Sequence, residues 1–168
     1  VASTTKLTAL FAGGTLIGFA IASRLLSQTS LPHNVALAGI AFGIPGFGAI
    51  IFASLDGGTI SFLIGTFLVG VGAGLFGHAT LTATMRAAPR EQVGLALGAW
   101  GAAQATSAGL GVALAGIVRD LVVGLQGATG NVAQTPYNIV FTIEIISLAA
   151  AVLVIWPLLK KTTKRNIP

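Results

Sequence analysis

Long apolar runs, separated by short polar breaks, dominate the pattern of hydrophobic and polar positions along this chain. A helix that spans a membrane needs about 20 mostly apolar residues. Five runs meet this length: residues 7–26, 35–54, 59–84, 93–118 and 139–159. Apolar and polar positions do not alternate within them, which excludes the strands of a membrane β-barrel. The pattern predicts an all-α fold: a single polytopic membrane helix bundle over residues 1–168, with five transmembrane helices.

The composition favours lipid as the solvent of these helices. Hydrophobic residues make up 54% of the chain and charged residues 8%, whereas soluble domains carry about 25% charged residues. The mean hydropathy is +0.91, so the chain has too few polar groups to cover a surface that faces water. The lipid bilayer is therefore the first expected partner.

The basic residues indicate which helix ends face the cytoplasm. With five crossings, seven of the nine basic residues fall on one side: Arg24, Arg86, Arg90, Lys160, Lys161, Lys164 and Arg165. Lys6 and Arg119 fall on the other side. Basic loops prefer the cytoplasm, so the C-terminus is predicted to be cytoplasmic. The net charge of +5 does not indicate nucleic-acid binding, because the basic residues gather at helix ends and do not line one face with aromatic residues.

Small residues predict where the helices pack, because hydrophobicity does not drive helix association inside lipid. The fourth run carries the longest line of them, called here the small-residue stripe: Gly94, Gly98, Gly101, Ala105 and Ala108, continuing to Ala115. Shorter pairs occur in the first three runs: Gly14 and Gly18, Gly39 and Gly43, Gly70 and Gly74. The stripe predicts that the fourth helix is the tightly packed, central helix of the bundle.

No catalytic residue and no metal site can be assigned from the sequence. The chain has no Cys, two His and four acidic residues. These residues match neither a hydrolytic triad nor a metalloprotease motif. An enzyme is therefore not expected.

Polar residues inside the predicted spans are the candidates for binding a pigment or another substrate. Glu144 lies in the fifth run, where a carboxylate is costly and usually faces the bundle interior, a cavity or a partner. A protonated Glu144 bonded to a neighbouring helix is the structural alternative. His78, in the third run, could ligate the magnesium of a chlorophyll through a ring nitrogen. It could equally bond a neighbouring helix or reach the lipid headgroups.

Trp100 and Gln104, both on the fourth run, complete the candidate set. Gln104 is expected near the membrane midplane, where it could bond a carbonyl of a substrate or pigment. An interhelical hydrogen bond, worth about 0.6 to 2 kcal/mol in membranes, is the alternative. Trp100 lies on the same line of the helix, which Ser107 and Gly111 continue.

Residues 94–106 read GLALGAWGAAQAT, and residues 107–111 continue the run as SAGLG. This run resembles the PucC family, also called the bacteriochlorophyll delivery family, a branch of the major facilitator superfamily associated with photosynthetic organisms. Shorter matching pieces are LTALFAGG at 7–14, GIVRD at 116–120 and YNIVFTIE at 137–144. The resemblance extends over essentially the whole chain.

The resemblance implies a place for this chain in a larger protein. Major facilitator proteins have twelve helices in two halves, with both termini cytoplasmic. The five helices would match the eighth to the twelfth, so the chain is expected to be the C-terminal part of such a protein, with its N-terminal half as a partner. The family also implies an integral protein of a photosynthetic membrane, either thylakoid or intracytoplasmic.

The resemblance further implies assembly of light-harvesting or photosystem complexes. Light-harvesting or reaction-centre subunits are then the expected partners, and chlorophyll or bacteriochlorophyll is the expected pigment. Two other functions stay open. One is a proton-coupled small-molecule transporter in which Glu144 titrates, and the other is a structural subunit held in a photosynthetic complex.

Cysteine labelling in sealed vesicles tests the predicted topology. Because the chain has no Cys, Thr162→Cys and Gly127→Cys each introduce one reactive thiol. We expect a membrane-impermeant maleimide to reach Thr162→Cys from the cytoplasmic side and Gly127→Cys from the periplasmic or lumenal side. Labelling of Thr162→Cys from the periplasmic or lumenal side contradicts the charge-based orientation.

Overall fold

The structure, a computed structural model, describes residues 2–28, 31–56, 58–126 and 135–165, and these residues contain no strand. Five α-helices and one short 3-10 helix follow in chain order: α1 (Ala2–Ser27), α2 (Pro32–Asp56), α3 (Thr59–Ala87), η1 (Arg90–Gln92), α4 (Val93–Gln126) and α5 (Thr135–Arg165). All five α-helices are long and apolar enough to cross a membrane. The predicted all-α bundle of five transmembrane helices is confirmed, and the chain is an integral membrane protein.

The helices extend beyond the apolar runs that predicted them. Helix α4 is 34 residues long and continues through Arg119 to Gln126, where the sequence pattern had suggested a break. Helix α5 begins at Thr135 and places Pro136 in its first turn, where the missing N–H of proline leaves no helical hydrogen bond unmade. An apolar run therefore marks the stretch of helix inside lipid and does not mark where the helix ends.

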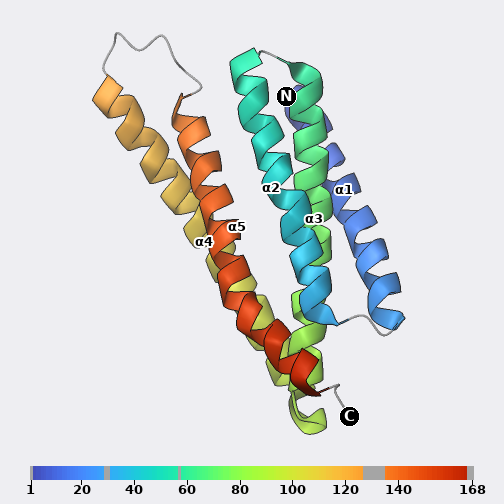
Figure 1. The fold of residues 1–168 in the computed structure, drawn as a ribbon. Helices are drawn as coiled ribbons and strands as arrows, with labels where there is room; N and C mark the ends of the chain where they lie inside the picture. Colours follow the sequence, from blue (N-terminus) through green and yellow to red (C-terminus); the bar gives the residue numbers. More distant parts are fainter. Residues whose placement is uncertain (1, 29–30, 57, 127–134, 166–168) are drawn as a thin grey trace.

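Helix α3 is the centre of the packing and lies between α1 and α2 (Figure 1). It runs parallel to α1, and Gly14 and Gly18 of α1 lie against Gly70 and Gly74 of α3. A Cβ added to Gly14 would lie 2.5 Å from the carbonyl oxygen of Phe67. Because that neighbour is backbone and cannot rotate away, any side chain at Gly14 would push the two helices apart.

Helix α2 packs antiparallel to α3 through a second set of glycines. A Cβ added to Gly72 would lie 2.6 Å from the carbonyl oxygen of Gly39, and one added to Gly65 would lie 2.6 Å from that of Gly46. Toward the other end of this pair, apolar side chains of α1, α2 and α3 form the buried core: Ala22, Leu26, Val35, Ala36, Val71, Leu75 and Ala79. Helices α1 to α3 thus form one tightly packed unit.

Among the described residues, helix α4 is not the central helix that the small-residue stripe predicted. A Cβ added to Gly94, Gly98 or Gly101 would meet no atom within 4 Å among the described residues. Residues 102–110, in the middle of α4, are exposed. Figure 1 shows α4 and α5 as a second layer that leans away from α1, α2 and α3. The stripe has no partner helix among the described residues, so its role as a packing face stays a prediction. The sequence shows that a helix face is small, but does not show which helix occupies it.

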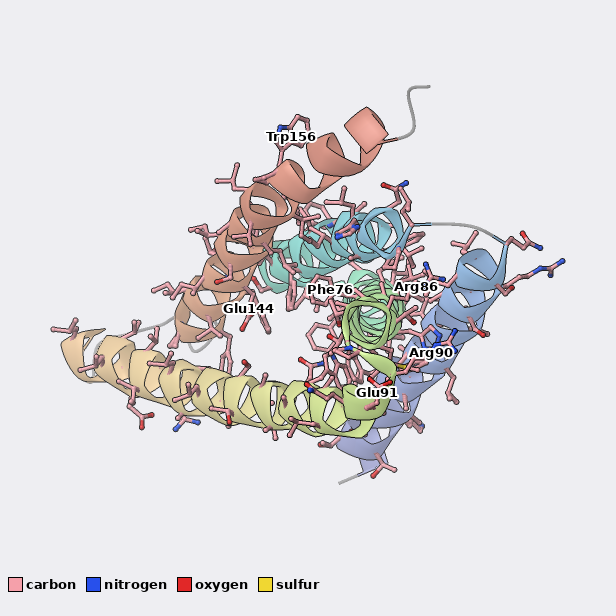
Figure 2. The ribbon with its side chains drawn as sticks, turned by 90° about the horizontal axis from the view of Figure 1, so that it is seen from below. Phe76, Arg86, Arg90, Glu91, Glu144 and Trp156 are labelled. Atoms are coloured by element: carbon pink, nitrogen blue, oxygen red, sulfur yellow. The ribbon has the colours of Figure 1, made fainter. Side chains whose placement is uncertain are left out.

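Arg24, Arg86 and Arg90 lie at one end of this bundle, where α1 ends, α2 begins and α3 ends. Figure 2 looks onto this end and shows Arg86 and Arg90 around the end of α3. The Nη2 atom of Arg86 donates a hydrogen bond of 3.1 Å to the carbonyl oxygen of Leu26, in the last turn of α1. A cation at this position also interacts favourably with the negative end of the helix dipole.

Two glycines of α3, three residues apart, provide a matched test of the packing. Gly74 faces the backbone of α1, whereas a Cβ at Gly77 would meet nothing within 4 Å. We expect Gly74→Ala to destabilise the protein by about 1–3 kcal/mol, because the helices must separate to admit the methyl group. Gly77→Ala should be neutral or stabilising by up to about 1 kcal/mol, since alanine is the better helix former.

Thermal unfolding in a mild detergent, followed by loss of the monodisperse species, measures both variants. A Gly74→Ala protein as stable as Gly77→Ala contradicts backbone contact between α1 and α3.

Candidate functional site

Trp100 is the candidate residue that the structure ties most clearly to another helix. Its Nε1 donates a hydrogen bond of 3.3 Å to Oγ1 of Thr80 on α3. The Thr80 hydroxyl in turn lies 2.9 Å from the carbonyl oxygen of Phe76, to which it donates. Trp100 is half-buried, so it joins the start of α4 to the central helix through a polar contact.

His78 lies on α3 and packs edge-on against Phe19 of α1, with ring centroids 5.1 Å apart and an interplanar angle of 64°. Its Nδ1 atom is buried and has no hydrogen-bond partner among the described residues, and the same holds for Nδ1 of His33 at the start of α2. A buried Nδ1 leaves no room for a macrocycle beside it. The Nδ1 atom of His78 is therefore not accessible to a pigment in this structure.

Gln104 and Glu144 lie on the outer layer of helices. Gln104 is exposed on α4, and Glu144 is half-buried on α5. Figure 2 shows Glu144 pointing inward from α5, toward the side on which α2, α3 and α4 lie. Within the described part of the chain, neither residue makes a hydrogen bond or an ion pair, so the structure assigns Glu144 no interhelical bond.

The four candidates do not converge on one site. They are spread over α3, α4 and α5, and no hydrogen bond joins any two of them in the described ranges. The same ranges hold no group of three or more His, Asp or Glu residues near enough to share a metal ion. The four candidates are therefore isolated polar side chains on otherwise apolar helices.

A cavity of about 600 Å³ lies at the opposite end of the bundle from Arg86, where α2 ends and α3 and α5 begin. Ser54 of α2 and Asn138 of α5 form part of its wall. The Ser54 hydroxyl lies 2.8 Å from Oδ1 of Asn138 and 2.7 Å from the carbonyl oxygen of Ile51, and it can donate to either. Phe47 and Phe141 add an aromatic contact between the same two helices, with centroids 6.0 Å apart.

Sequence reasoning missed this cavity, because the four candidates do not line it. Ser54, Thr59 and Asn138 sit at the edges of the apolar runs, where polar residues are the usual markers of a helix end. One signal was available in the sequence. The topology brings three helix ends to the same side of the membrane, and each of them carries a small polar side chain.

Comparison with known proteins identifies a family that this chain resembles. The family profile described as "PUCC protein" matches residues 1–163. The chain is 58% identical over 163 residues to "Protein PucC" of Rhodobacter capsulatus, an alignment that covers 96% of this chain and 35% of the relative. It is 51% identical over 160 residues to "Protein PucC" of Cereibacter sphaeroides, covering 95% and 35% respectively.

A third relative, "Protein PucC" of Rhodovulum sulfidophilum, is 55% identical over 139 residues, which cover 83% of this chain and 30% of the relative. The chain thus spans about a third of the length of these relatives. No solved structure matches it.

Proposed function

This chain belongs to the PUCC protein family, and on that basis we propose that it serves as a non-enzymatic membrane assembly factor for light-harvesting or photosystem complexes. The finer proposal is that it hands over chlorophyll or bacteriochlorophyll during this assembly. Its place of action is then a photosynthetic membrane, thylakoid or intracytoplasmic, with the C-terminus in the cytoplasm. The family match over residues 1–163 is the observation that carries the proposal.

The open face of α4 supports a role in assembly. In α1, α2 and α3, glycines that face another helix touch its backbone, whereas Gly94, Gly98 and Gly101 of α4 face open space. Inside lipid, small residues permit close packing that larger side chains prevent. We therefore propose that the small-residue stripe receives a helix from outside the described residues. Candidate sources are the N-terminal half of a full-length protein and a light-harvesting or reaction-centre subunit.

Pigment binding would use the isolated polar side chains of the apolar helices. His78 would hold the magnesium through Nε2, and Gln104 or Trp100 could meet ring substituents of the pigment. A neutral imidazole is a suitable magnesium ligand. The apolar surface of the helices suits the remainder of such a pigment, since binding sites for apolar molecules need few polar groups.

Proton-coupled transport is the second candidate function, and Glu144 is the observation that favours it. Its carboxyl group is half-buried in a membrane span and has no bonding partner in the described residues. An intramembrane carboxylate in this situation is a common element of proton pathways. A structural subunit of a photosynthetic complex is the third candidate, supported by the rigid glycine-packed unit of α1 to α3.

Substitution in the stripe tests the assembly proposal. Gly98→Leu and Gly101→Leu should leave the fold of the chain intact, because a Cβ at either position meets nothing within 4 Å. Both should nevertheless reduce co-purification with partner subunits, since a bulky side chain blocks a close helix contact. Gly124→Leu, on the same helix outside the stripe and equally open, is the matched control. Equal recovery of partner subunits with all three variants contradicts a contact at the stripe.

Glu144 and His78 separate pigment delivery from transport. If the protein delivers pigment, Glu144→Gln should still support formation of the photosynthetic complex, and His78→Leu should lower the pigment that purifies with the protein. Absorbance of the complex and of the purified protein measures both effects. Normal complex levels in both variants, together with loss of proton-driven uptake in Glu144→Gln, would favour the transporter.

A further inference from the structure

In the cavity between α2, α3 and α5, polar side chains lie at one end and apolar side chains at the other. None of the functions above uses this arrangement. On each of the three walls of the cavity a polar residue lies near the helix end and an aromatic or aliphatic residue lies one turn deeper in the span. On α2 these residues are Ser54 and Ile50, on α3 they are Thr59 and Phe62, and on α5 they are Asn138 and Phe141. A separation of three or four residues corresponds to about 4.5–6 Å along the helix axis.

This order fits an amphiphile that enters with its head toward the membrane surface and its tail toward the midplane. The described residues that line the cavity include no charged side chain, so an uncharged polar group such as an ester is favoured over an ionic group inside it. The volume of about 600 Å³ falls within the range of about 300–1,000 Å³ of typical small-molecule sites.

Asn138 supplies the specific polar contact. With its Oδ1 accepting from Ser54 at 2.8 Å, its amide NH₂ group makes no hydrogen bond to the described residues. That group can donate to a carbonyl oxygen. The Oδ1 and Nδ2 atoms of an amide are assigned from the hydrogen-bond network. If Ser54 donates to Ile51 instead, the flipped amide donates one N–H to the Ser54 oxygen. Either assignment leaves at least one amide N–H of Asn138 for a ligand.

We propose that this cavity binds the ester group and the first part of the tail of a long-chain ester. Asn138 donates to the ester carbonyl, and Ile50, Phe62 and Phe141 surround the chain. Both membrane glycerolipids and pigments esterified with a long alcohol have this chemistry. The inference goes beyond the assembly proposal and does not rest on it, because a membrane lipid would occupy the site in a protein of any function.

Photocrosslinking of the native, full-length protein in membrane vesicles tests the site. The probe is a phospholipid that carries a diazirine on its acyl chain, and the labelled positions are mapped by mass spectrometry. We expect labelling at residues 50–62 and 137–141 to exceed that of residues 110–125 of α4, which are mostly apolar and mostly exposed. Competition with an unlabelled phytyl ester or an unlabelled phospholipid then identifies the source of the ligand, and displacement by either supports the site.

Two variants with matched controls make the result specific. Ala53→Leu fills the cavity from a buried position on α2, and Ala41→Leu makes the same change at an exposed position of that helix. Asn138→Leu removes the donor from α5, and Thr142→Leu removes an exposed hydroxyl one turn further along. In Asn138→Leu, the loss of one hydrogen bond worth about 0.5–1.5 kcal/mol should weaken labelling of the cavity residues by about two- to tenfold.

We expect Ala53→Leu and Asn138→Leu to lower labelling of the cavity residues and both controls to retain it. Labelling that is no stronger in the cavity than on residues 110–125, or that is unchanged in both variants, overturns the proposal. Levels of the assembled photosynthetic complex, scored in the same strains, test the assembly function separately.

Discussion

Direct contact between helix backbones at glycine is the interaction on which the rest of this structure depends. Inside lipid, apolar side chains gain nothing by leaving one apolar surrounding for another, so packing at short range must hold the helices together. Helix α3 obtains such contact on two faces, with α1 at Gly70 and Gly74 and with α2 at Gly65 and Gly72. Once α3 is fixed, it places Thr80 beside Trp100, Arg86 beside the end of α1, and Phe62 in the wall of the cavity.

The sequence predicted those features of the fold that depend on the composition of a single segment. Apolar runs identified all five spans, because the membrane imposes one length and one polarity on each of them. The arrangement of the spans did not follow. Gly70 and Gly74 looked like a minor pair beside the long line from Gly94 to Ala115, yet α3 is the packed helix and α4 is the exposed one. Which glycine face has a partner is a property of two helices, and a single segment does not contain it.

The candidate site was predicted less well, for a related reason. Polar residues deep in a span, such as Glu144 and Gln104, draw attention because each is costly in lipid. The cavity instead combines residues that are unremarkable one at a time. Ser54 and Asn138 are 84 positions apart in sequence, and their proximity arises only when α5 packs against α2. Trp100 was selected for its place beside Gln104, whereas its contact in the structure is to Thr80.

Helix α4 is longer than the hydrocarbon core of a bilayer is thick. At about 1.5 Å per residue, its 34 residues extend about 51 Å, against a hydrocarbon core of about 30 Å. Near its far end, Arg119 and Asp120 form an ion pair of 2.7 Å that offsets both charges, and the apolar residues Leu121, Val122 and Val123 follow. A helix with this hydrophobic mismatch must tilt strongly, thicken the surrounding lipid or project from it. The outer layer of this protein thereby becomes sensitive to membrane thickness, so the lipid composition of its membrane is one of the variables that set the tilt of α4.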